Sequence, residues 1–198
     1  MLYLLIKWLI GPIILLVTRP IVYGRQNLRV KGKAIFIANH RSMWDPLILA
    51  LVSPRNIHFM AKKELFENRF MNRVMTWLGA FPVSRGESDL SAMRTSLKLL
   101  ADGEALGIFP EGHRYVDGEM HEFGNGLALI ALRSGAPVVP AYIQGSYRLF
   151  RRVTVTVGAP VALDDLGRRC DSRTLSAATE RIQNAMRALR EGDVKKVC

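Results

Sequence analysis

From residue 30 onward, short apolar runs alternate with segments in which apolar residues recur at helical spacing. The apolar runs are typical of strands that are buried on both faces. The predicted strands cover residues 34–38, 57–61, 106–109, 138–143 and 153–157. The predicted helices cover residues 46–52, 70–78, 89–103, 126–135 and 172–192. Strands that alternate with helices predict an α/β fold: one layered domain with a mixed, mostly buried sheet flanked by helices.

The N-terminal segment has a different pattern, because Leu2–Val17 is nearly continuous hydrophobe, interrupted by Lys7 and by a Gly-Pro pair. A helix that spans a bilayer needs about 20 apolar residues, so this run is short. No signal-peptide cleavage pattern follows it, and the next residues are rich in cations. We therefore predict a retained hydrophobic helix that lies in, or dips into, a membrane face with anionic lipids. A helix buried in the globular domain is the alternative.

The charge of the chain restricts its partners. With 28 Lys and Arg against 17 Asp and Glu, the formal net charge is +11, which attracts nucleic acid, acidic proteins or anionic lipid surfaces. The cations are spread along the chain and aromatic residues make up only 8%, so a nucleic-acid partner is not expected. Cys170 and Cys198 lack the spacing of metal ligands, and no metal site is predicted.

The stretch FIANHRSMWDP, residues 36–46, is the first candidate site. Its apolar run stops at His40, and Asp45 follows five positions later, directly before Pro46 and an apolar helix. Asp45 is thus a candidate helix N-cap. Its second carboxylate oxygen could also hold one imidazole nitrogen, which would make His40 a general base for a hydroxyl. The chain has no G-x-S-x-G motif and no Walker loop, so a direct group transfer is favoured over a covalent intermediate.

Two further stretches place arginines just after apolar segments. LGAFPVSRG, residues 78–86, contains Arg85, and IFPEGHR, residues 108–114, ends in Arg114. The planar arginine fork matches a phosphate group, and α/β sheets gather their sites at the ends of strands. For a single arginine a solvated surface role is the default, but two of them together with His40 favour a site for an anionic substrate.

These motifs resemble those of the glycerolipid acyltransferases, in particular the 1-acylglycerol-3-phosphate acyltransferase branch. NHRSMWD fits the H-x-x-x-x-D signature, and FPVSRG, FPEGHR and VVPAYIQGS resemble the second, third and fourth blocks, in the family order. The resemblance implies transfer of an acyl chain from acyl-CoA or acyl carrier protein to lysophosphatidate, giving phosphatidate, without a further cofactor. It also implies two regions: a hydrophobic anchor with a basic connector at 1–29, and an acyltransferase catalytic domain at 30–198.

The matched motif positions imply the roles of individual residues. His40 would deprotonate the acceptor hydroxyl, and Asp45 would orient the imidazole. An enzyme with a lipid acceptor must work at a bilayer surface, so the expected location is the cytoplasmic face of the cell membrane. The positive charge would then serve both docking on anionic lipid and attraction of the anionic acyl donor.

The same resemblance implies a binding site for the acceptor. Arg85 and Arg114 would bind its phosphate, and Glu111 and Gly112 would shape the pocket. Because a carboxylate repels a phosphate, Glu111 is expected to accept a glycerol hydroxyl or to hold a cation in place. Lys62, in MAKKELF, either assists phosphate binding or lies on a solvated helix start.

The chain departs from the family pattern around the third block. His113 stands where a small hydroxyl residue is usual, Tyr115 where serine is frequent, and Gly124 where a lysine is common. These positions flank the expected head-group site, so glycerol-3-phosphate or another lysophospholipid stays an alternative acceptor. A catalytically silent lipid-binding scaffold is a further alternative, although the presence of both His40 and Asp45 argues against it.

Overall fold

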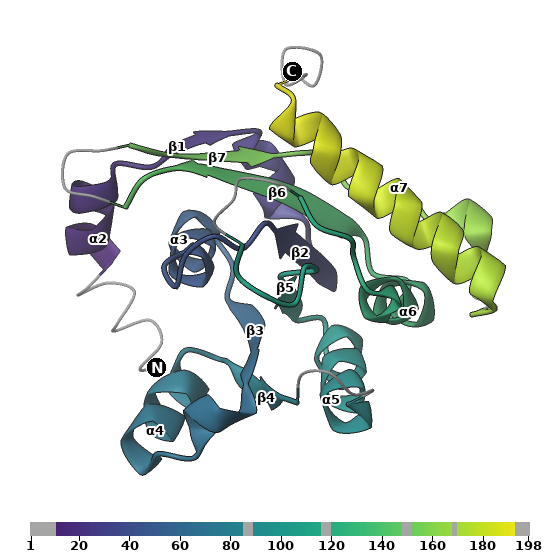
Figure 1. The fold of residues 1–198 in the computed structure, drawn as a ribbon, viewed down its shortest axis with the longest axis horizontal. Coiled ribbons are helices and arrows are strands. Elements are labelled where there is room, and N and C mark those ends of the chain that lie inside the picture. Colours follow the sequence, from purple (N-terminus) through teal and green to yellow (C-terminus); the bar gives the residue numbers. More distant parts are fainter. Residues whose placement is uncertain (1–10, 85–88, 116–119, 148–151, 168–169, 193–198) are drawn as a thin grey trace.

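A sheet runs through the centre of the molecule in the strand order β1-β7-β6-β2-β5-β3-β4 (Figure 1). The computed structural model describes residues 11–84, 89–115, 120–147, 152–167 and 170–192, and the statements below concern these. Only β6 and β7 pair antiparallel, while all other neighbouring strands are parallel. The strands are β1 (Ile21–Tyr23), β2 (Ala34–Ala38), β3 (Ile57–Lys62), β4 (Phe81–Val83), β5 (Ala105–Ile108), β6 (Val138–Gly145) and β7 (Val153–Val157).

Helices cover both faces of this sheet. Ile14 of α2 and the apolar side of α3 belong to the core of one face, and α5, α6 and α7 pack on the other. The helices are α2 (Gly11–Thr18), α3 (Asp45–Val52), α4 (Arg69–Trp77), α5 (Leu90–Ala101), α6 (Asn125–Ser134) and α7 (Ser172–Arg190). Short 3-10 turns are η1 (Arg25–Arg29), η2 (Lys63–Phe66) and η3 (Asp164–Leu166).

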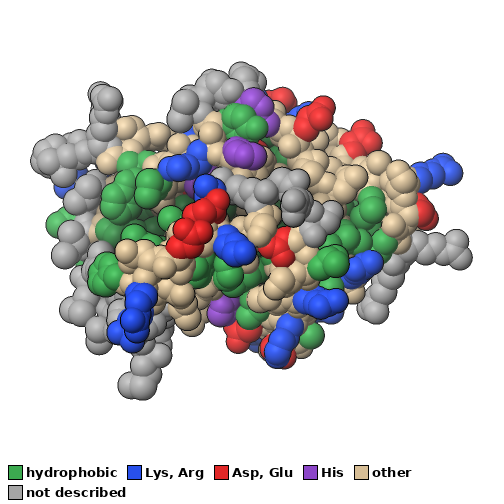
Figure 2. Space-filling model, turned by 60° about the horizontal axis from the view of Figure 1, so that its bottom comes forward, with side chains coloured by type: hydrophobic (Ala, Val, Ile, Leu, Met, Phe, Trp, Pro, Cys, Tyr) green, Lys and Arg blue, Asp and Glu red, His purple; other side chains and the backbone are tan. Residues whose placement is uncertain are grey.

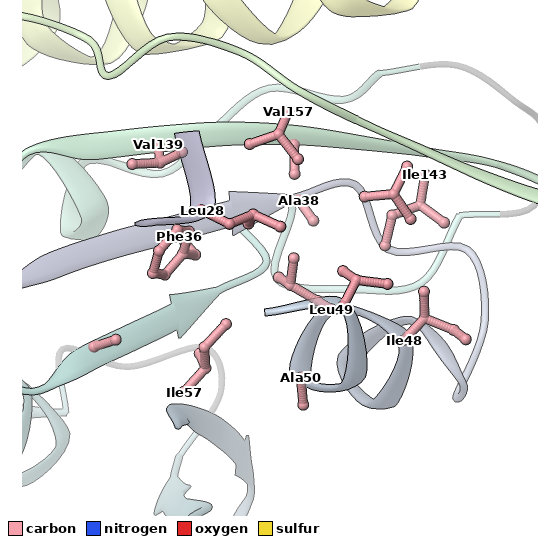
Figure 3. Packing of buried hydrophobic residues seen from close by; sticks show 14 of the residues in the cluster. Leu28, Phe36, Ala38, Ile48, Leu49, Ala50, Ile57, Val139, Ile143 and Val157 are labelled. Carbon is pink, nitrogen blue, oxygen red and sulfur yellow. The ribbon is translucent and has the colours of Figure 1, made fainter. Parts of the chain in front are cut away.

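The central strand β2 shows why the apolar runs lack alternation. All of its residues are fully buried, because Phe36 faces the α3 side while Ile35 and Ile37 face the α5–α7 side. Figure 3 shows Phe36 packed in the first of these cores with residues such as Leu49 of α3. Burial of one such side chain contributes about 1.5–3 kcal/mol. The sequence of a strand that is covered on both faces is therefore continuously hydrophobic.

The structure confirms the predicted α/β fold with its mixed, mostly buried sheet. Each predicted strand and helix is present, with ends that differ by one or two residues. Two short strands were not predicted: β4, and β1, which lies within the region 1–29 and pairs with β7. Gly24 follows β1 with a φ of +67°, and a Cβ there would lie 2.0 Å from the Val157 carbonyl oxygen. Glycine therefore allows the chain to pass this close to β7.

The predicted hydrophobic segment Leu2–Val17 lies partly outside the described residues, which begin at residue 11. Its described part forms α2, where Ile14 contacts the core and the Leu16 side chain is 70% exposed. Among the described helices, none combines the length and the apolar character that crossing a membrane would require.

Candidate active site

The carboxyl ends of four neighbouring strands meet at one edge of the sheet, because β6, β2, β5 and β3 run parallel. His40 follows β2, the stretch Glu111–Arg114 follows β5, and Lys62 is the last residue of β3. Tyr147 follows β6. Ligand sites of open α/β sheets lie at this edge, so the topology gathers most of the residues that the sequence motifs indicated.

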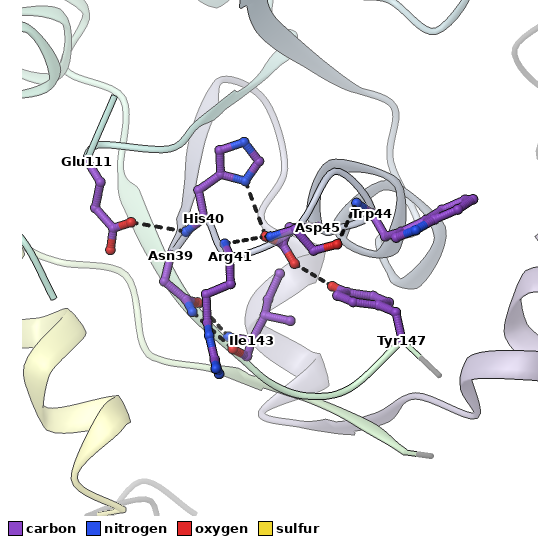
Figure 4. A network of polar contacts seen from close by, with 9 residues as sticks. Asn39, His40, Arg41, Trp44, Asp45, Glu111, Ile143 and Tyr147 are labelled. Atoms are coloured by element: carbon purple, nitrogen blue, oxygen red, sulfur yellow. Dashed lines mark hydrogen bonds and ion pairs between the residues drawn. The ribbon is translucent and has the colours of Figure 1, made fainter. Parts of the chain in front are cut away.

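The Asp45 carboxylate is the centre of a polar network (Figure 4). Its Oδ2 accepts hydrogen bonds from the backbone amides of Arg41 at 2.7 Å and Ser42 at 2.6 Å, and lies 3.2 Å from His40 Nδ1. Its Oδ1 accepts a hydrogen bond from the Tyr147 hydroxyl at 2.5 Å. The Asp45 residue is only 1% exposed. Several hydrogen-bond donors from the turn and from Tyr147 thus surround a buried carboxylate.

The prediction that Asp45 caps helix α3 is wrong. Asp45 is the first residue of this helix, and Trp44 holds the cap position without a side-chain hydrogen bond to the helix. The carboxylate points back to the amides of the preceding turn instead of forward to the first helical turn. Pro46 still lies within the first turn of the helix. An N–H at this position has no partner inside the helix, so its absence in proline costs no hydrogen bond. Oδ2 of the carboxylate thus binds both the turn and the His40 ring.

His40 is fixed by three further contacts. Its ring stacks on Phe109, with centroids 4.3 Å apart and planes at 28°. Its backbone amide donates to Glu111 Oε2 at 3.3 Å, and its carbonyl accepts from the Tyr115 amide at 3.0 Å. When Nδ1 donates to Asp45, Nε2 carries the lone pair. Among the described residues, no group forms a hydrogen bond with Nε2, which can therefore act as a base.

The third motif forms a turn that brings an exposed cation close to His40. Glu111 is 8% exposed and binds the His40 amide, and Gly112 has a φ of +69°, which suits a residue without Cβ. Arg114 is exposed, and no carboxylate of the described residues pairs with it. The hydrogen bond from the Tyr115 amide to the His40 carbonyl joins the backbone next to this arginine to the backbone of His40.

The remaining two predicted binding residues are less closely joined to His40. Lys62 is exposed and pairs with Glu64, with 3.0 Å between Nζ and Oε1. β5 separates its strand from β2. Arg85 lies outside the described residues, just beyond β4. The structure therefore brings together His40, Asp45 and Glu111 by direct contacts, and leaves Lys62 at the margin of this edge.

Two residues of the network were not predicted from the sequence. Tyr147 lies directly after the VVPAYIQGS block, and burial raises the pKa of its phenol, with the Asp45 charge adding to this effect. The hydroxyl therefore stays protonated and donates a hydrogen bond to Asp45. Asn39 is buried, and its side chain accepts from the Ile143 amide at 2.7 Å and donates to the Ile143 carbonyl at 3.0 Å. It joins the end of β2, which His40 follows, to β6, which Tyr147 follows.

Comparisons with known proteins show the family to which the chain belongs. The sequence model of the family described as Acyltransferase matches residues 19–144. The 1-acyl-sn-glycerol-3-phosphate acyltransferase of Bacillus subtilis is 33% identical over 174 residues, which cover 85% of this chain and 86% of that protein. The enzyme of the same name from Streptococcus pneumoniae is 30% identical over 164 residues, covering 79% of this chain and 60% of that protein.

A solved structure shows the same fold. The crystal structure of the 1-acyl-sn-glycerophosphate (LPA) acyltransferase, PlsC, from Thermotoga maritima matches with a TM-score of 0.71 and 22% sequence identity. The match covers 98% of this chain and 79% of that one. The fold, the family model and the relatives together define an α/β enzyme of acyl-group transfer. The chain belongs to the acyltransferase family, as the four sequence blocks predicted.

Proposed function

We propose that this protein moves a fatty acyl group from an acyl thioester to the free hydroxyl of 1-acylglycerol-3-phosphate, which gives phosphatidate for phospholipid synthesis. The observation that carries the proposal is the imidazole of His40, held through Nδ1 by a buried carboxylate while Nε2 is left without a partner among the described residues. The names of the Bacillus and Streptococcus relatives support this acceptor.

The reaction follows from the position of this base. Nε2 of His40 removes the proton from the acceptor hydroxyl, and the oxygen attacks the thioester carbonyl carbon. A tetrahedral oxyanion forms, for which backbone amides near the motif turns are the natural donors. When it collapses, the C–S bond breaks and the thiolate takes the proton from the imidazolium. The products are the new ester and the free thiol of the donor, and no covalent enzyme intermediate is needed.

The acceptor phosphate would be bound by Arg114, with Arg85 as its second partner. The guanidinium of Arg114 is exposed and pairs with no carboxylate of the described residues, and Arg114 precedes the residue that bonds to the His40 carbonyl, which supports this role. Glu111 already binds the His40 amide, so we assign it to shaping the turn, together with Gly112. Lys62 would assist only after release from Glu64. The acyl donor, acyl-CoA or acyl carrier protein, is anionic and suits the net charge of +11.

The site would work against the cytoplasmic face of the cell membrane. Met43 and Trp44 lie in the same turn as His40 and Asp45, and they are 74% and 50% exposed. On the face in Figure 2, hydrophobic side chains gather toward the left, with Lys and Arg side chains beside them. Exposed apolar groups near cations suit an anionic bilayer surface. The segment Leu2–Val17 would add an apolar anchor.

An acylation assay tests the proposal. The detergent-purified protein is given labelled acyl-CoA or acyl carrier protein, each with lysophosphatidate, other lysophospholipids or glycerol-3-phosphate. His40→Ala is compared with His58→Gln, since His58 lies on β3 and bonds to the Gly79 carbonyl. Transfer to lysophosphatidate that disappears only in His40→Ala would support the proposal. Transfer only to another acceptor would keep the mechanism and change the product, and no transfer at all would favour the silent lipid-binding scaffold.

A further inference from the structure

The Asp45 carboxylate is held by groups from two distant parts of the chain. Arg41, Ser42 and His40 all belong to its own turn, whereas Tyr147 is 102 residues away in sequence. We propose that Tyr147 is a positioning residue for acyl transfer: its hydroxyl fixes the plane of the Asp45 carboxylate and thereby aims His40 Nε2 at the acceptor. This inference rests on the proposed function, because it assigns Tyr147 a task in that reaction.

A carboxylate plane needs a donor on each oxygen to be fixed. The terminal torsion of an aspartate is broad and roughly two-fold, so the group turns easily when only one oxygen is held. The donors of the turn all approach Oδ2. Among the residues that the structure describes, Tyr147 is the donor that approaches Oδ1. Without it, a buried carboxylate oxygen would lose a partner, and the carboxylate could rotate away from His40.

The position of Tyr147 is itself set by the sheet. It follows β6, and Asn39 joins that strand to β2 through two hydrogen bonds with Ile143. The Tyr147 ring packs against the same core cluster as α3. Two rigid supports therefore meet at Asp45: the turn after β2 and the end of β6. The hydrogen bond from the Tyr147 hydroxyl to Asp45 links these two supports, and Asp45 in turn orients His40.

A simpler role for Tyr147 would be to anchor the chain after β6. The two roles differ in what loss of the hydroxyl changes. In the described part of the chain, the charged or titratable residues in contact with His40 or its network are Asp45, Glu111, Arg41, Tyr115 and Tyr147. If the hydroxyl is removed, the Asp45 carboxylate can turn away from His40, and an imidazolium loses part of the attraction that favours its charged form. The acidic limb of the pH profile of kcat/KM should then move to lower pH, which the loss of an anchor alone would not cause.

The experiment compares Tyr147→Phe with wild type in the acylation assay, because phenylalanine keeps the ring and removes only the hydroxyl. Tyr142→Phe is the matched control, since Tyr142 lies on β6 in the core of the opposite face. We expect a fall in kcat of about 10- to 100-fold in Tyr147→Phe, which corresponds to loss of one hydrogen bond to a charged group. The acceptor KM should stay close to wild type, the Tm should fall by a few degrees because Asp45 Oδ1 loses its buried partner, and Tyr142→Phe should keep its kcat.

A double-mutant cycle separates action through Asp45 from an independent effect. If Tyr147 acts through Asp45, Tyr147→Phe should cost little further kcat in an Asp45→Asn background. Equal costs in both backgrounds would overturn the proposal, as would an unchanged kcat, or a lower Tm with an unmoved acidic limb. A wild-type protein that acylates no acceptor would instead contradict the proposed function, which is a different result.

Discussion

Asp45 Oδ2 lies 3.2 Å from His40 Nδ1, and the same oxygen accepts the two backbone amides that precede it in the turn. One carboxylate thus shapes the turn and orients the imidazole. Asp45→Ala would remove both the contacts that shape the turn and the contact that orients the imidazole, so it cannot separate the two tasks. A change that keeps the size and removes the charge is more informative.

Asp45→Asn should lower kcat/KM by about 10²- to 10⁴-fold, which is the range of a lost general-base contribution. The asparagine oxygen can still accept the amides of Arg41 and Ser42, but the group cannot stabilise an imidazolium as a carboxylate does. Steady-state kinetics with lysophosphatidate measure the effect, and circular dichroism checks that the Tm is kept. A folded Asp45→Asn enzyme with more than a tenth of wild-type activity would contradict the role of the carboxylate.

Asn39→Ala should reduce the free energy of unfolding by about 1–3 kcal/mol, because the amide and carbonyl of Ile143 would both lose their buried partner. Urea denaturation measures this change. Asn56→Ala is the matched control, since Asn56 is exposed and its side chain takes part in no described contact. Equal stability of the two variants would show that Asn39 does not join β2 to β6.

The sequence predicted the parts of the fold that depend on burial of long apolar runs. β2 and β6 were predicted because both faces of these strands are covered. β1 and β4 span three residues each and are only partly buried, so their composition carries little signal. The strand β1 also lies in a stretch rich in Lys and Arg, from which we predicted a basic connector and not a strand. Its pairing with β7 depends on residues more than a hundred positions away.

The site shows the same division between local and distant contacts. The pair His40 and Asp45 was predicted because a short motif contains both residues. The N-cap interpretation of Asp45 was wrong because the Asp-Pro pair before a helix suits a cap equally well, and only the backbone path shows where the carboxylate points. Tyr147 was not predicted, since nothing in the local sequence indicates a partner 102 residues away.

Replacement of Met43 and Trp44 by serine should weaken binding to anionic lipid vesicles by about tenfold or more, because both exposed side chains would lose apolar burial in the bilayer. Co-sedimentation with vesicles of phosphatidylglycerol and phosphatidylcholine measures the binding. Leu90→Ser is the control: Leu90 is 60% exposed on α5, which packs on the other face of the sheet. A loss of binding in the control alone would place the membrane surface elsewhere.

The stability contributed by Asp89 should depend on pH. Hydrogen bonds from the backbone amides of Ser84 and Ala92 lower the pKa of this carboxyl below its ordinary value of 3.8. A lowered folded-state pKa gives stability that is present above pH 3.8 and is lost as the pH falls through the folded value. The Tm of wild type should exceed that of Asp89→Ala at pH 7, and the difference should shrink toward pH 2. A difference that is independent of pH would contradict this origin.

Arg114→Ala should raise the KM for lysophosphatidate by about 10- to 100-fold with a smaller change in kcat, because a charge-assisted hydrogen bond to the phosphate contributes about 1.5–3 kcal/mol. An acceptor that lacks the phosphate, monoacylglycerol, should be used equally well or poorly by wild type and variant. Arg94→Ala is the matched control, since Arg94 is an exposed arginine on α5. A kcat that falls while the KM stays constant would instead place Arg114 at the reacting carbonyl, and equal kinetics in all three proteins would exclude it from the phosphate site.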